Sequence, residues 1–117
     1  NENKIKKAKL LNEKLSGIRE VKIFKEKTEA KNIYLNYVIR VKEREKLIKY
    51  LFKNGIDIIP GFVISCAAQD QFKEFRCECP NSLIMQSESL YLPIYSPIKK
   101  ETILRIVGLI KKYYGVN

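Results

Sequence analysis

The C-terminal part of the chain places a short strand pattern directly before a long helical one. Residues 90–93 form a short apolar run that ends at Pro93, which predicts a strand that stops there. Residues 101–114 follow as a strongly periodic helix, with apolar positions three or four residues apart at Ile103, Ile106, Val107 and Ile110. This succession predicts layers of helix and strand around one core.

The rest of the sequence extends this pattern into an α+β domain. The further elements predicted are a helix at 3–15, a strand at 33–41, a helix at 43–53, a strand at 56–59 and a helix at 80–86. Residues 21–24 are a candidate for an additional short strand. No period persists over residues 62–79, which are predicted to form a functional loop. The predicted fold is α+β, a small sheet of about three strands covered by helices on one side.

The chain has 117 residues, which is enough for one compact domain with a modest core. Residues 1–117 are therefore treated as a single domain. Helical periodicity starts almost at Asn1, and we expect the chain to be a piece of a longer protein. The longest mainly apolar stretch, residues 58–68, is about half as long as a membrane helix and contains Pro60 and Gly61. No membrane span is expected.

The formal net charge is +10, and the excess lies in the N-terminal half. Residues 1–53 hold 16 Lys and Arg against 7 Asp and Glu, whereas residues 54–117 hold 7 against 6. A basic surface attracts phosphate groups, so a small nucleic-acid-binding module is one alternative function. However, 18 of the 23 basic residues are lysines, and base recognition favours arginine. We therefore expect a solvated lysine-rich face, with neither a nucleic acid nor a membrane as partner.

The chain has three cysteines and no histidine. An odd number of cysteines fits reduced thiols in the cytoplasm better than a disulfide framework. A structural zinc site takes four ligands, so the three thiols predict no metal site. Without histidine no Ser-His or Cys-His pair can form, and neither a carboxylate pair nor a glycine-rich phosphate loop stands out. The sequence therefore predicts no catalytic residue and no self-contained active site.

A succession of short motifs covers nearly the whole chain. They are Tyr37 to Val41, Asn54-Gly55-Ile56, Pro60-Gly61-Phe62, Cys79-Pro80, and Leu92-Pro93 followed by the closing helix. In this order and spacing, the sequence resembles the C-terminal small domain of the DegT/DnrJ/StrS family of sugar aminotransferases. The resemblance implies the small-domain fold of the fold-type I enzymes that use pyridoxal phosphate (PLP).

The resemblance also implies an activity for a longer parent protein. Members of the family are usually homodimers that transfer an amino group from glutamate to a nucleotide-linked keto-sugar, most often for cell-surface polysaccharide biosynthesis. Their PLP-binding lysine, the acid that pairs with the ring nitrogen and most phosphate contacts belong to an N-terminal large domain. That domain would be the main partner of this chain. No lysine here has the family's PLP-binding context, so the resemblance implies no cofactor-binding residue and no PLP bound to this chain alone.

The resemblance places substrate contacts in the loop after Pro60-Gly61. Many relatives have a histidine there, whereas this chain has Val63, Ile64, Ser65 and Cys66. We predict that Phe62, Ser65 and Cys66 bind substrate, with Phe62 against a ring face and Ser65 at a sugar hydroxyl. The alternatives are that Phe62 belongs to the core and that Ser65 is an ordinary loop residue. The missing histidine also leaves open an orphaned, non-catalytic aminotransferase-like domain.

Other polar and aromatic residues near these motifs have simpler interpretations. Tyr91 and Tyr95 flank Leu92-Pro93 and are predicted to pack between the strand and the final helix. Arg40 and Arg105 match no motif and are predicted to be surface residues.

Overall fold

The computed structural model describes residues 2–25, 29, 34, 36–61, 70–75, 80–95 and 97–116, apart from the side chains of Phe72 and Phe75. Its elements are α1 (Glu2–Leu15), β1 (Val21–Ile23), β2 (Tyr37–Val41), α2 (Arg44–Lys53), β3 (Ile59–Pro60), the 3₁₀ helix η2 (Asp70–Phe75), α3 (Pro80–Glu88), β4 (Ser89–Leu92) and α4 (Lys100–Tyr113). The four predicted helices coincide with α1 to α4, with ends that differ by two residues or fewer.

The described strands form one antiparallel sheet in the order β1-β2-β4-β3. The sheet is larger than the predicted one of about three strands, because Val21–Ile23 pairs with β2 as an edge strand. The strand predicted at 56–59 is shorter than expected, since only Ile59 and Pro60 pair with β4. Pro60 has no N–H to donate to a further neighbour, which suits β3 to the opposite edge of the sheet.

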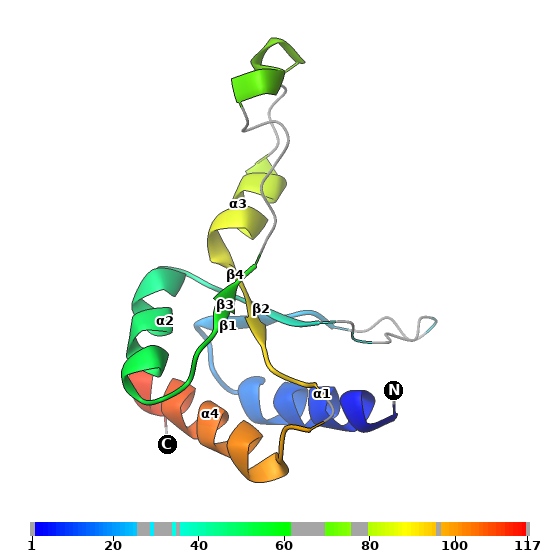
Figure 1. Ribbon diagram of the computed structural model, residues 1–117, viewed down its shortest axis with the longest axis vertical. Coiled ribbons are helices and arrows are strands. Elements are labelled where there is room, and N and C mark those ends of the chain that lie inside the picture. The colour runs from blue at the N-terminus through cyan, green and yellow to red at the C-terminus, as the bar shows by residue number, and fades with distance from the viewer. Residues whose placement is uncertain are drawn as a thin grey trace.

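Successive side chains of a strand point to opposite faces of the sheet. In β2, Tyr37, Ile39 and Val41 are buried, whereas Val38 and Arg40 are only partly buried. Figure 1 shows α1, α2 and α4 grouped on one side of the sheet, and α4 contacts both α1 and α2. These three helices are called the helix layer below. The predicted covering of one sheet face by helices is therefore confirmed.

The core lies between the sheet and the helix layer. The helix layer contributes Ala8, Leu11 and Leu15 from α1, Leu47 and Leu51 from α2, and Ile103, Ile106, Val107 and Ile110 from α4. Each fully buried leucine or isoleucine side chain stabilises the fold by about 1.5–3 kcal/mol. The periodic apolar positions of the sequence are thus the positions that hold the layers together.

The turn after α2 explains how the chain re-enters the sheet. Gly55 has a φ angle of 86°, in the left-handed region that favours glycine. The N–H of Gly55 donates to the carbonyl of Phe52, and the N–H of Ile56 donates to the carbonyl of Leu51. This Schellman-type ending satisfies the last carbonyls of the helix and directs residues 56–59 toward β4.

A projecting segment, made of η2 and α3, extends away from the sheet and the helix layer (Figure 1). We call the described residues 70–75 and 80–88 the arm. α3 contacts β2 and β4, but none of its residues is buried, and Leu83 and Ile84 are exposed. Among the described residues, no helix has the length and apolar character needed to cross a membrane.

Candidate functional site: a groove on the open face of the sheet

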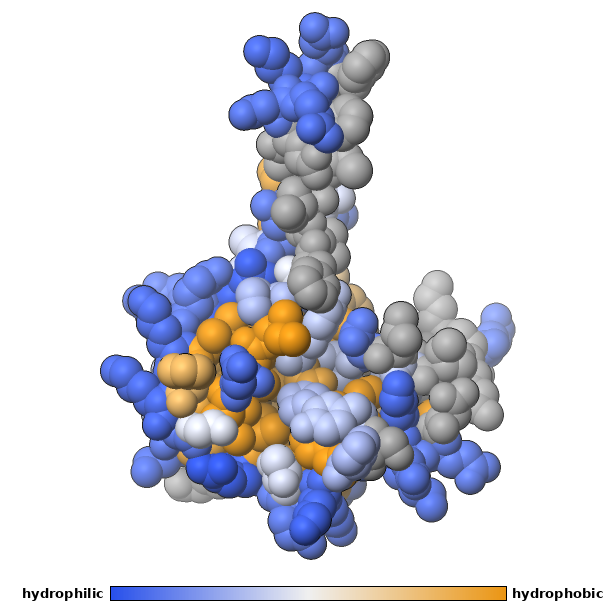
Figure 2. All heavy atoms as spheres, in the orientation of Figure 1, coloured by the Kyte–Doolittle hydropathy of each residue, from blue (hydrophilic) through white to orange (hydrophobic). Residues whose placement is uncertain are grey.

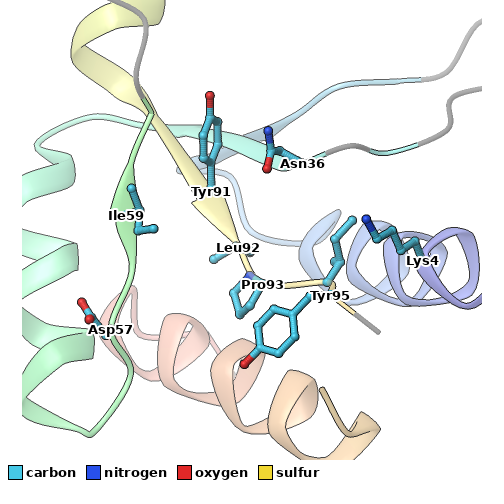
Figure 3. A pocket seen from close by; sticks show the side chains of 9 residues that line it. Lys4, Asn36, Asp57, Ile59, Tyr91, Leu92, Pro93 and Tyr95 are labelled. Carbon is cyan, nitrogen blue, oxygen red and sulfur yellow. The ribbon is translucent and has the colours of Figure 1, made fainter. Parts of the chain in front are cut away.

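The face of the sheet opposite the helix layer carries Val38, Tyr91 and Ile59 in one row, because Tyr91 pairs with both of the others. We call it the open face. At its edge a groove of about 250 Å³ lies between β3, β4 and α1 (Figure 3). Its lining residues are Lys4, Asn36, Asp57, Ile59, Tyr91, Leu92, Pro93, Ile94 and Tyr95. This volume is below the roughly 300–1,000 Å³ of most ligand pockets, so the groove suits part of a ligand or a side chain of another domain.

Two large apolar or aromatic side chains of the groove lie mainly in solvent. Ile59 is 55% exposed and Tyr95 is 57% exposed. Exposed apolar surface rimmed by polar groups is typical of interaction sites. Lys4, Asn36 and Asp57 supply that polar rim.

The prediction that Tyr91 and Tyr95 pack between the strand and the final helix is wrong. Leu92 and Ile94 are the buried residues of this stretch. Because alternate residues of an extended chain point to opposite sides, Tyr91 and Tyr95 are directed away from the helix layer and line the groove. Of the two arginines predicted at the surface, Arg105 is exposed, whereas Arg40 is partly buried and contacts Met85 of α3.

No motif marked Lys4, Asn36 or Asp57 as groove residues. For Asp57 the usable signal was the alternation of burial along residues 56–59. Ile56 and Ile58 are buried, whereas Asp57 and Ile59 are exposed. The alternation within residues 56–59 therefore places Asp57 and Ile59 on the same side. Lys4 reaches the groove only through the packing of α1, which sequence spacing does not reveal.

Hydrogen bonds hold the chain that follows β4 in place beside α1. The Nζ of Lys7 donates to the carbonyl oxygen of Tyr95 at 2.9 Å, and the N–H of Ile98 donates to the same oxygen at 3.1 Å. The backbone that carries the exposed Tyr95 ring is thus fixed by α1 and by its own turn.

The sequence-predicted substrate residues Phe62, Ser65 and Cys66 lie outside the described residues, so their roles stay predictions. Gly61, the residue directly before Phe62, is described. The N–H of Gly61 donates to the carbonyl oxygen of Ser89 at 2.9 Å. A Cβ atom on Gly61 would lie 2.9 Å from the Cβ of Ser89, so this close approach requires glycine.

The pKa is raised for two tyrosines elsewhere in the fold, the buried Tyr37 and the partly buried Tyr114. Burial, and to a smaller extent Tyr34, raises the pKa of Tyr37, whose hydroxyl donates to Oδ1 of Asn12 at 2.6 Å. Burial also raises the pKa of Tyr114 to about 12, with smaller contributions from Tyr113 and nearby carboxylates. Both phenols therefore stay protonated at neutral pH, and neither supplies a general base.

The described residues contain no group of three His, Cys, Asp or Glu side chains that could hold a metal ion. The groove therefore offers binding contacts, with one ammonium, one carboxylate, one amide and two tyrosines, and no recognisable catalytic pair.

Comparison with known proteins assigns the chain to a protein family. The model of the DegT/DnrJ/EryC1/StrS aminotransferase family matches residues 1–111. The chain belongs to this family. The resemblance identified in the sequence motifs is thereby confirmed, although no curated protein matches the chain.

Solved structures with similar folds include a DegT/DnrJ/EryC1/StrS aminotransferase and proteins described as sugar aminotransferases. A DegT/DnrJ/EryC1/StrS aminotransferase from Brucella abortus is 23% identical, with a TM-score of 0.86 over 97% of this chain and 31% of its own. The sugar aminotransferase CalS13 from Micromonospora echinospora is 18% identical, with a TM-score of 0.82 over 95% and 30%. A further similar protein, from Streptococcus pneumoniae, has been solved in PLP and PMP forms. Its PLP form is 16% identical, with a TM-score of 0.81 over 97% of this chain and 31% of its own.

The chain spans about 31% of the length of the solved structure from Brucella abortus. PLP chemistry requires a lysine, an acid at the ring nitrogen and a phosphate cradle. The described residues do not fit this requirement. No described lysine is buried, and Figure 3 shows Lys4 and Asp57 on opposite sides of Pro93 and Tyr95.

Proposed function

We propose that this chain is the C-terminal small domain of a PLP-dependent sugar aminotransferase. The whole enzyme would transfer an amino group from glutamate to a nucleotide-linked keto-sugar for cell-surface polysaccharide biosynthesis, in the cytoplasm and as a homodimer. The match of the family model to residues 1–111 is the observation that carries this proposal. A sugar substrate and PLP are supported by the sugar aminotransferase CalS13 and by the PLP form of the Streptococcus pneumoniae protein.

In this proposal PLP and its lysine belong to a large domain, and this chain contributes structure around the reaction. PLP, when bound, supplies an electron sink for the carbon atom that gains or loses the amino group. The open face, with exposed Ile59 and Tyr95, would meet the large domain. The groove and the segment after Gly61 would form one wall of the substrate pocket and exclude water from it.

Because the proposal assigns PLP binding to the large domain, it can be tested by comparing the full-length protein with residues 1–117 alone. The full-length protein that contains this chain, supplied with PLP, is expected to form amino-sugar nucleotide and 2-oxoglutarate from glutamate and a nucleotide-linked keto-sugar. The chain of residues 1–117 alone is expected to form no product and to show no absorbance of lysine-bound PLP.

Two results would contradict the proposal in different ways. Stoichiometric binding of PLP to residues 1–117, with the absorbance of a lysine-bound cofactor, would place the catalytic lysine in this chain. A full-length protein that binds PLP but uses no nucleotide-linked keto-sugar would leave the fold assignment intact and overturn the substrate.

A further inference from the structure

A second groove lies on the helix layer, between α1 and the start of α4. Its volume is about 460 Å³, and it is lined by Asn3, Lys6, Lys7, Lys9, Leu10, Glu13, Lys100 and Ile103. Four of these residues are lysines and one is a carboxylate, so the groove has a net positive charge. We call it the lysine groove.

The lysines of the groove differ in their freedom to meet a ligand. Lys7 is engaged, because its Nζ donates to the carbonyl of Tyr95. Lys6, Lys9 and Lys100 are exposed, and the neighbouring Lys99 is exposed as well. Between them, the partly buried Leu10 and the buried Ile103 give the groove an apolar floor.

The side-chain types select among the anions that such a groove could bind. None of its described lining residues is aromatic, whereas single-stranded nucleic acids stack their bases on aromatic side chains. The lining residues that the structure describes include no arginine either, whereas a small anion of fixed shape is best held by the planar fork of arginine. Lysines are compact charges on flexible stems, which suits a surface that presents many similar anionic groups. A membrane leaflet rich in anionic lipid is such a surface.

The position of the groove agrees with contact at a surface and not with insertion. The apolar side of α1, made of Ala8, Leu11 and Leu15, is already buried in the core. α1 therefore has no free apolar face to enter a bilayer, and contact would be electrostatic. In Figure 2, hydrophilic side chains gather along the lower edge of the body, where Figure 1 places α1 and α4. This edge lies on the helix layer, so binding there would leave the open face free.

We propose that the lysine groove docks this protein on anionic lipid at a membrane surface. The exposed ammonium groups of Lys6, Lys9 and Lys100 make the contact, and Lys99 adds to the local positive charge. The interaction is reversible and sensitive to salt, because each charge acts within a screening length of about 8–10 Å at physiological ionic strength. This proposal does not depend on the proposed aminotransferase activity.

The test is co-sedimentation of residues 1–117 with vesicles of phosphatidylserine and phosphatidylcholine, and with vesicles of phosphatidylcholine alone. The protein is expected to bind only the anionic vesicles. Neutralising a lysine at an anionic membrane surface weakens binding by about fivefold, so the K6Q/K9Q/K100Q variant is expected to bind about a hundredfold more weakly. Lys7 is left unchanged because it supports the backbone at Tyr95.

A matched variant separates the groove from net charge. K49Q/K53Q/K112Q removes the same number of exposed lysines from α2 and the end of α4, and it is expected to retain most of the binding. Equal losses in the two variants would overturn the proposal in favour of a diffuse charge effect. Equal binding to neutral vesicles would also overturn it. Tighter binding to duplex DNA than to anionic vesicles at about 150 mM salt would replace lipid with nucleic acid as the partner.

Discussion

Arg44 of α2 donates a hydrogen bond from Nη1 to the backbone carbonyl oxygen of Ser89 at 2.7 Å. The same oxygen accepts the N–H of Gly61. Ser89 is 1% exposed, and the Arg44 side chain is 13% exposed, so the bond is largely shielded from water. Arg44 therefore ties α2 to the place where the chain leaves the sheet at Gly61 and returns at Ser89.

Replacement of Arg44 by alanine is expected to lower the free energy of unfolding by about 1.5–3 kcal/mol, because a charged donor to a buried carbonyl is lost. Urea unfolding of the chain measures this change. Lys46→Ala on the same helix is the matched control, since Lys46 pairs with Glu43 only at the exposed surface. Identical unfolding midpoints for Arg44→Ala and the unmodified chain would show that the bond contributes nothing.

Gly61→Ala tests the close approach at the base of the arm. The added Cβ would lie 2.9 Å from the Cβ of Ser89 and 3.2 Å from its carbonyl oxygen, so the edge of the sheet has to shift. We expect a loss of about 1–3 kcal/mol in the free energy of unfolding. Gly108→Ala is the control, because a Cβ there meets nothing within 4 Å and Gly108 lies inside α4. That variant is expected to gain about 0.5–1 kcal/mol, and a similar loss in both variants would contradict the steric explanation.

The helices and the main strands were predictable because their periods are set by burial on one side. α4 carries its buried side chains at Ile103, Ile106, Val107 and Ile110, the positions that the sequence predicted. β1 was only a candidate, because three residues are too few to establish an alternation. The pairing of β1 with β2 depends on how α1 returns the chain to the sheet, which is a tertiary contact.

The groove was less predictable than the fold. Its residues range from Lys4 to Tyr95, and they meet only because of the strand order β2-β4-β3 and the packing of α1. Tyr95 differs from its prediction because an aromatic residue next to a strand does not have to join the core, and its side chain is 57% exposed. The burial of Leu92 and Ile94 shows that the local alternation continues past Pro93 and points Tyr95 outward.

Tyr37→Phe is expected to change how stability depends on pH. Burial raises the pKa of Tyr37 above its ordinary value of 10.0, so the folded state keeps the proton while the unfolded state loses it. The resulting stabilisation is fully present below pH 10 and declines as the pH rises above that value. At neutral pH, loss of the bond to Asn12 should cost about 1 kcal/mol. At about pH 11 the difference between the two proteins should shrink.

Urea unfolding at neutral and alkaline pH measures this effect. Tyr95→Phe is the matched control for the loss of a tyrosine hydroxyl, since the Tyr95 side chain lies mainly in solvent. A Tyr37→Phe difference that stays constant up to about pH 11 would exclude the buried phenol as the source of alkaline destabilisation.

Ile59→Ser tests whether the open face meets another domain. Ile59 is already 55% exposed in this chain, so the substitution should change the stability of residues 1–117 by no more than about 0.5 kcal/mol. In the full-length protein the same change should lower the midpoint of thermal unfolding, because the docked side chain would be buried there. Phe52→Ser is the control, since Phe52 is 67% exposed on α2, within the helix layer. It should be neutral in both proteins. If the two variants behave alike in the full-length protein, the large domain does not dock on the open face.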